Sequence, residues 1–244
     1  MKRAILGILL LMVILFGTQQ ASYAITLNYM SGGVSAWTNI EDSYHHQYGQ
    51  NSAQASGALS GVGVAGASAS AGATSSGGYY VSLAVNMSSS IDGYYVGAHA
   101  FTADQTENEG FILLQVAASP GDTGNSGQIG YGFSNNLNVG VPNWEYSNGY
   151  FPLVITINGV AVVNEYFGGN GLLNVNVDDI IGIACHTLAD NLTDFGYPVS
   201  GFMSADFDVS LTPINPVPLP PAVLLFGSGL LGLAGWRRFK KYPG

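Results

Sequence analysis

The residues whose spacing could support chemistry in this 244-residue chain are carboxylates gathered in two polar stretches. The first stretch carries Asp104, Glu107 and Glu109, and the second carries Asp190 and Asp194. Clustered carboxylate oxygens are ligands that calcium, a hard cation, takes in proteins. Neither stretch has the glycine-turned spacing of a dedicated calcium loop. A calcium site at these five residues is therefore a hypothesis, and two solvated turns are its alternative.

Paired carboxylates also hydrolyse glycosidic bonds when their carboxyl groups lie about 5 to 9.5 Å apart. Glu107 and Glu109 have the most suitable spacing, but they occupy a polar segment between apolar runs, which favours a solvated turn. No motif of a serine hydrolase, a zinc enzyme, a phosphate-binding loop or a dinucleotide-binding fold accompanies them. The sequence therefore predicts no catalytic residue, and no cofactor apart from calcium.

The histidines and the cysteine do not form an obvious site. His45 and His46 are adjacent, so on a strand they would point to opposite faces and could not share a metal; we expect them in a solvent-facing loop. The same alternation argues against a pair formed by Cys185 and His186. Cys185 also ends an apolar run, which is typical of a buried small hydrophobe rather than a nucleophile.

Aromatic residues beside polar loops suggest a different chemistry. Ring faces stack on the C–H faces of sugars, while Asn, Asp and backbone groups bind the hydroxyls. Core packing explains such residues equally well, so the sequence singles out none of them. They are Trp37, Tyr44, Tyr48, Trp144, Tyr146, Tyr150 and Tyr197.

Charge is distributed in an extreme way. The six Lys and Arg residues are confined to the two ends, whereas residues 25–216 hold all 15 carboxylates, with histidines as their only basic side chains. Without Lys or Arg this segment cannot clamp phosphate groups, which excludes nucleic acid and anionic lipid as direct partners. The single cysteine also excludes an intrachain disulfide.

Short apolar runs separated by Gly, Asn, Asp, Ser and Pro predict an all-β body. Asn158-Gly159 between two β-branched runs predicts a type I′ hairpin, and Asp178-Asp179 predicts a second reversal. We expect strands at residues 25–29, 34–40, 59–65, 67–73, 79–87, 94–102, 110–117, 128–133, 153–157, 160–166, 172–177, 180–187 and 201–212.

Residues 53–78 are mostly Gly, Ala and Ser, a composition shared by flexible linkers. The alternation of Ala and Ser over residues 67–71, however, places every Ala on one face of a strand. We therefore expect thin strands packed closely against a second sheet. In the last strand, alternation likewise predicts that Met203, Phe207 and Leu211 face inward while Asp206 and Asp208 face outward.

Both ends carry the features of targeting segments. Lys2-Arg3, an apolar run and Ser22-Tyr23-Ala24 predict a signal peptide over residues 1–24, removed by signal peptidase. At the other end, prolines interrupt the chain, and the uncharged run 222–236 predicts a short transmembrane helix. Arg237, Arg238, Lys240 and Lys241 would then hold the terminus in the cytoplasm.

The terminal segment 217–244 resembles the PEP-CTERM class of bacterial sorting signals, in the variant that reads Val217-Pro218-Leu219-Pro220. The resemblance covers residues 217–241 and includes glycines such as Gly227 and Gly229 in the apolar run. It implies recognition by an exosortase, a membrane-embedded processing enzyme, and transfer of the body from the inner membrane to the surface or polysaccharide of a Gram-negative bacterium. Leu219 stands where many members have glutamate, which leaves the exosortase subtype open.

These observations together predict the fold and the function of residues 25–216. We expect a single two-sheet β-sandwich over residues 25–216, of jelly-roll or lectin-like kind. Its function would be non-enzymatic, as a secreted surface or matrix protein that contributes to extracellular polysaccharide, biofilm or adhesion. The alternatives are a carbohydrate-binding module and a secreted polysaccharide-acting enzyme.

The targeting segments predict the ends of the mature protein. Mass spectrometry should find a chain that begins near Ile25 and lacks residues 237–244. Replacing the four terminal cations by neutral residues should let the tail pass through the membrane, because charge retains it. Recovery of the intact C-terminus from the outer surface fraction would contradict the sorting hypothesis.

Overall fold

The computed structural model of the chain describes residues 24–122, 124–140, 152–166, 168–192 and 197–214. These residues form fifteen strands, and they contain no helix that could cross a membrane. The predicted signal peptide, apart from Ala24, and the whole predicted sorting segment lie outside the described residues, as do Trp144, Tyr146, Tyr150 and Asp194.

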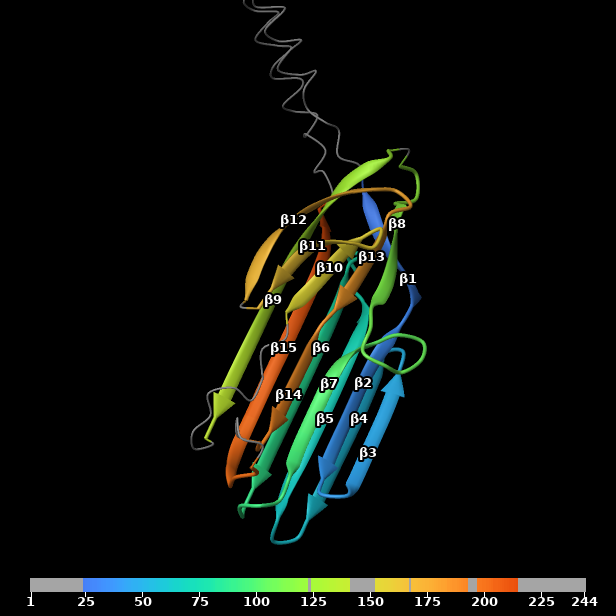
Figure 1. Cartoon of the computed structure of the whole chain (residues 1–244). Coiled ribbons are helices and arrows are strands. Elements are labelled where there is room, and N and C mark those ends of the chain that lie inside the picture. Colours follow the sequence, from blue (N-terminus) through green and yellow to red (C-terminus); the bar gives the residue numbers. More distant parts are fainter. Residues whose placement is uncertain (1–23, 123, 141–151, 167, 193–196, 215–244) are drawn as a thin grey trace, which may run out of the picture.

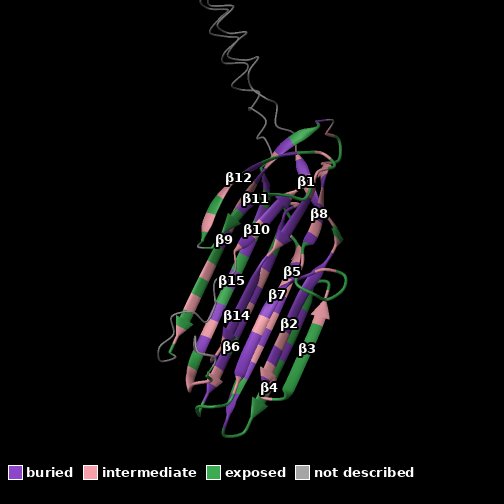
Figure 2. Cartoon of the chain, viewed as in Figure 1, coloured by how far each residue is buried: buried purple, intermediate pink, exposed green. Residues whose placement is uncertain are grey.

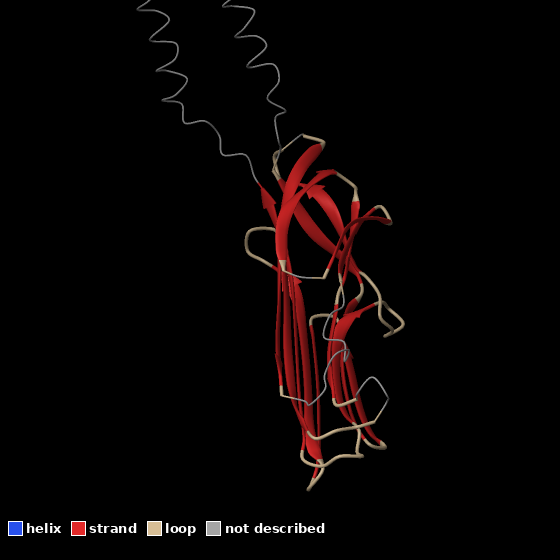
Figure 3. Cartoon of the chain, turned by 60° about the vertical axis from the view of Figure 1, so that its left-hand side comes forward, coloured by secondary structure: helices blue, strands red, loops and turns tan. Residues whose placement is uncertain are grey.

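The strands form three antiparallel sheets arranged in two layers (Figures 1 and 3). The first layer is a six-stranded sheet in the order β12 (Gly169–Asn176), β9 (Ser126–Val139), β15 (Gly201–Ile214), β6 (Tyr79–Ser89), β5 (Gly63–Ala73) and β4 (Ser52–Leu59). The second layer contains a four-stranded sheet in the order β14 (His186–Asp190), β7 (Val96–Ala103), β2 (Gly33–Ile40) and β3 (Ser43–Gly49). Its other part is a five-stranded sheet in the order β1 (Ile25–Ser31), β8 (Ile112–Ala118), β13 (Ile180–Ala184), β10 (Leu153–Ile157) and β11 (Val160–Glu165).

The second layer is divided where the chain leaves one sheet and enters the next. Gly32 separates β1 from β2 with φ of 98°, a value that favours glycine, and a Cβ there would lie 2.7 Å from the carbonyl oxygen of Phe111. Cys185 lies at the corresponding passage from β13 of the five-stranded sheet to β14 of the four-stranded sheet. The all-β, sandwich-like prediction is confirmed, with the correction that one layer of the expected two-sheet sandwich consists of two sheets.

Short side chains fill the space between the six-stranded and four-stranded sheets. Ala65, Ala67, Ala69 and Ala71 of β5 are almost completely buried, and β5 packs against β2 and β7. On β2 and β7 the facing residues include Ala36, Ala98 and Ala100, all at 0% exposure. The prediction of thin strands packed against a second sheet is confirmed, and a linker at this position is excluded (Figure 2).

The predicted turn at Asn158-Gly159, the predicted reversal at Asp178 and the predicted inward face of the last strand are confirmed. Asn158 and Gly159 have φ of 52° and 79°, and β10 pairs with β11 across them, as expected for a type I′ hairpin. Asp178 also has a positive φ and lies in the predicted reversal, although the arms β12 and β13 belong to different sheets. On β15, Met203, Phe207 and Leu211 are buried as predicted.

One predicted strand and one predicted loop were wrong. Residues 59–65 contain the turn between β4 and β5 rather than a strand, because Gly61 reverses the chain with φ of 78°. The segment containing His45 and His46 is not a loop but strand β3, which pairs with β2 along its length. Its polar residues are compatible with a strand because β3 lies at the edge of its sheet and is mostly exposed.

Candidate functional site

On β2, β7 and β14 of the four-stranded sheet, the aromatic and histidine side chains lie on the outer face, whereas the inner face carries alanines and β-branched residues. Direct partners in antiparallel strands share a face, and Trp37 pairs with His99, as Phe101 does with His186. All four project from the outer face, opposite the buried alanines. Tyr44 and His46 extend this row of rings onto β3, which pairs with β2.

A chain of polar contacts runs through this outer face. Oε1 of Glu109 lies 3.1 Å from Nδ1 of His186, and Nε2 of His186 lies 3.2 Å from Nδ1 of His99. With neutral imidazoles, His186 donates from Nδ1 to the carboxylate and accepts at Nε2 from His99. This tautomer assignment leaves Nε2 of His99 as a hydrogen-bond acceptor.

The rings of the outer face contact one another in sequence. Trp37 stacks on His99 with 3.8 Å between ring centroids and 19° between planes, and Tyr44 lies 5.5 Å from Trp37 on a tilted plane. His46 follows at 6.3 Å from Tyr44, and its Nε2 lies 2.6 Å from Oγ of Ser35. Tyr44, between Trp37 and His46, is accessible from solvent, because 58% of its surface is exposed.

The loop between β7 and β8 places Glu109 beside His186. Asp104 accepts hydrogen bonds at Oδ1 from the backbone nitrogen and the hydroxyl of Thr106, at 2.7 and 2.6 Å. The backbone nitrogen of Asp104 donates to the carbonyl of Asn108, and Glu107 takes a positive φ of 65°. The carboxylate of Asp104 thus holds the turn together, and the bridge between Ala103 and Glu109 closes it.

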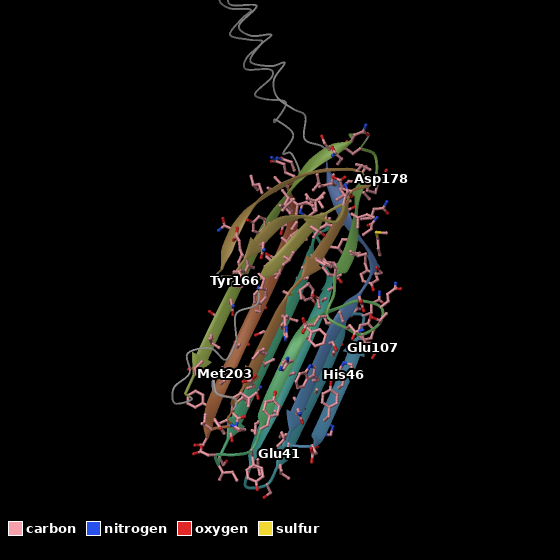
Figure 4. The ribbon with its side chains drawn as sticks, in the orientation of Figure 1. Glu41, His46, Glu107, Tyr166, Asp178 and Met203 are labelled. Carbon is pink, nitrogen blue, oxygen red and sulfur yellow. The ribbon has the colours of Figure 1, made fainter. Side chains whose placement is uncertain are left out.

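A hollow of about 490 Å³ lies between this loop and the outer face. Figure 4 labels two of its residues, His46 on β3 and Glu107 on the loop, which lie in the same region of the molecule. Rings form one part of its lining and polar loop groups the other, namely Trp37, Tyr44, His46, His99, Phe101, Thr106, Glu107, Asn108 and Glu109. The volume lies within the range of about 300 to 1,000 Å³ that is usual for small-molecule sites.

Burial and hydrogen bonding set the protonation states of His99 and Glu109. Burial lowers the pKa of His99 to about 3, and the neighbouring His186 reinforces this shift, which Glu109 opposes. The hydrogen bond with His186 lowers the pKa of Glu109, against the effect of its burial. Neutral His99 and ionised Glu109 are therefore the forms present at neutral pH.

The carboxylates predicted as calcium ligands do not all come together. Asp104, Glu107 and Glu109 share one loop, whereas Asp190 lies at the end of β14, where burial raises its pKa. Among the described residues, no group of three or more His, Cys, Asp or Glu side chains could hold a metal ion. Calcium binding remains a prediction, and Asp194 lies outside the described residues.

The buried position of Cys185 is confirmed. Its thiol is 5% exposed, burial raises its pKa, and its backbone nitrogen donates to Oγ1 of Thr102. Tyr48, one of the aromatics noted in the sequence, donates its hydroxyl to the carbonyl of Gly32 and so supports the bend between β1 and β2. Tyr197 is exposed and does not line the hollow.

Sequence reasoning missed His99 and His186 as members of a site. It treated His186 only in relation to Cys185, and it did not consider His99. The available signal was the alternation of small and large residues. Alanines alternate with His99 and Phe101 in residues 98–101, and Thr187 and Ala189 alternate with His186 and Leu188. Such a pattern places small residues against a close layer and large residues on the other face.

Comparison of the chain with protein-family models, curated proteins and solved structures found no match.

The burial of His99 predicts that acid destabilises the protein. Between the ordinary His pKa of 6.5 and the folded value near 3, the unfolded chain binds a proton that folded His99 does not bind. Stability is therefore lost as pH falls below about 6.5. Between pH 7 and pH 5 the free energy of unfolding should fall by about 2 kcal/mol more in the wild type than in His99→Gln.

Urea unfolding followed by circular dichroism at both pH values measures this difference. His45→Gln, a change at an exposed histidine on the opposite face of β3, should keep the pH dependence of the wild type. Equal pH dependence in wild type and His99→Gln would show that His99 is not held neutral by the fold.

Proposed function

We propose that this chain is an exported, non-enzymatic surface or matrix protein that binds neutral saccharides in the hollow beside Tyr44. The observation that carries the proposal is the outward row of rings on the four-stranded sheet, next to carboxylate and amide groups. Aromatic faces stack on sugar rings, and convergent polar groups bind their hydroxyls. Burial in a core would have placed these large rings inward, where alanines lie instead.

The charge of the body supports a neutral ligand. Residues 25–216 have no Lys or Arg, and Glu107 and Glu109 both line the hollow. A uronate or sulfated sugar would meet carboxylates with no cation to balance its charge. Hydroxyl groups, in contrast, donate well to carboxylates and to Nε2 of His99. Neutral glycans are therefore the ligand class that fits.

The geometry favours binding over hydrolysis. A glycosidase needs a carboxylic acid with a raised pKa to protonate the leaving oxygen. Glu109 has a lowered pKa because His186 hydrogen-bonds to it, so it is a poor proton donor at neutral pH. This argument supports the carbohydrate-binding alternative over the enzyme. It is compatible with a matrix protein, since matrix proteins hold polymers without cleaving them.

The proposed delivery route rests on the terminal segments. An exosortase-type enzyme would process the precursor at the inner membrane, near Val217-Pro218-Leu219-Pro220, after signal peptidase acts on the other end. β1 begins and β15 ends at one end of the molecule, where Ile214 pairs with Gln128 and a Cβ at Gly127 would lie 3.0 Å from Ile25 (Figure 3). A lectin-like sandwich held from that end would present the hollow on its side.

Binding of neutral polysaccharides by Tyr44 variants tests the proposal. Removing the exposed ring in Tyr44→Ala should weaken the affinity of the hollow about tenfold, because a ring contact contributes about 0.5 to 1.5 kcal/mol beyond its buried area. The measurement is retardation of the full chain in gels that contain dextran, laminarin or hydroxyethylcellulose, in a detergent that carries no sugar.

Tyr94→Ala is the matched control, since Tyr94 is also exposed but does not line the hollow. It should leave retardation unchanged. Stronger retardation by alginate, an acidic polymer, than by every neutral polymer would contradict the assignment of ligand class. Equal retardation of wild type and Tyr44→Ala would contradict the assignment of the hollow.

A further inference from the structure

The outer face of the six-stranded sheet contains a second hollow, of about 410 Å³. This sheet and the four-stranded sheet, whose outer face carries the first hollow, form opposite layers of the sandwich (Figure 3). The outward-facing residues of the second hollow form two neighbouring rows across three strands. In one row Tyr80 pairs with Ser210 and Ser210 with Gly132, and in the other Asp208 pairs with Ser82 and Ser134. The site is thus built entirely on regular, paired strands.

Tyr80 supplies an exposed aromatic ring at this hollow. A Cβ added to Gly72, its partner on β5, would lie 3.2 to 3.5 Å from two ring carbons and the hydroxyl oxygen of Tyr80. The outer end of the Tyr80 side chain therefore lies over Gly72, where no side chain competes for the space. The residue remains accessible, with 40% of its surface exposed.

The other residues that line this hollow supply oxygen atoms that can form hydrogen bonds. Asp208 is exposed and, among the described residues, has no hydrogen-bond or ion-pair partner for its carboxylate. Ser82, Ser134 and Ser210 add hydroxyls that donate and accept. Gly132 adds no side chain to the floor, so a ligand can approach the backbone there.

We propose that this second hollow is a binding site for neutral saccharide chains, with Tyr80 as the stacking ring and Asp208 as the acceptor for sugar hydroxyls. The lack of Lys and Arg in the body disfavours anionic ligands here as it does at the first hollow. The inference extends the proposed function, since it gives the protein ligand sites on both faces. One molecule would then join two polymer chains, which is a physical way to hold a matrix together.

Affinity electrophoresis of the full chain, under the conditions given for Tyr44, tests the second site. Tyr80→Ala and Asp208→Asn should each reduce retardation, with about a tenfold loss of affinity in the second hollow, while binding in the first persists. Tyr80→Phe should retain binding, because the ring remains. Asp206→Asn, a change on the same strand and face but outside the hollow, should behave as wild type.

Combining the variants separates this inference from the proposed function. The double variant Tyr44→Ala/Tyr80→Ala should migrate in the polysaccharide gels as it does in a plain gel, whereas each single variant keeps part of the retardation.

If Tyr80→Ala and Asp208→Asn bind like wild type, the second site is excluded and the proposed function stands. If Tyr44→Ala binds like wild type while the Tyr80 variant loses all retardation, the first site is wrong and the second stands. No retardation of wild type by any of the three neutral polymers would overturn both.

Discussion

Close packing of two alanine-lined faces is the constraint on which the rest of this structure depends. β5 presents Ala65, Ala67, Ala69 and Ala71 to β2 and β7, whose buried residues include Ala36, Ala98 and Ala100. A Cβ at Gly57 of the neighbouring strand would lie only 3.4 Å from Ile40 and Thr38, which shows how closely the layers approach. Each alanine buries little apolar area, so stability depends on many such contacts and on the long antiparallel ladders. On β2, β7 and β14 the aromatic and histidine rings lie on the outer face instead, among them Trp37 and His99.

The carboxylates of the body are stabilised without help from Lys or Arg. With no Lys or Arg in the body, carboxylates are stabilised by hydrogen bonds instead of ion pairs with these residues: Asp104 by Thr106, and Glu109 by His186. These contacts lower the pKa of both carboxyl groups and give each a structural role. The remaining exposed carboxylates, such as Asp208, face water on a surface of one sign. Such a surface repels polyanions and leaves hydroxyl-rich neutral polymers as suitable partners.

The fold could be predicted to a useful depth because its signals are local. Asn158-Gly159 specified a turn, and the Ala and Ser alternation specified the buried face of β5. Strand β3 was missed because an edge strand needs little apolar character, and the division of the second layer at Gly32 and Cys185 depends on contacts between distant segments. The site could be predicted only in part. Trp37, Tyr44 and the carboxylates of residues 104–109 were identified as candidates, but their meeting with His99 and His186 follows from strand register, which the sequence alone does not specify.

The most direct test of saccharide binding at the outer face is the fluorescence of Trp37. The chain has three tryptophans, so replacing Trp144 and Trp236 by phenylalanine leaves Trp37, whose ring lies between His99 and Tyr44, as the single reporter. Titration with short oligosaccharides of glucose in α-1,4, β-1,3 or β-1,4 linkage should change its emission saturably with at least one of them, and oligosaccharides of alginate should not. An emission spectrum that stays constant with every neutral oligosaccharide, or that responds equally to alginate, would contradict the account.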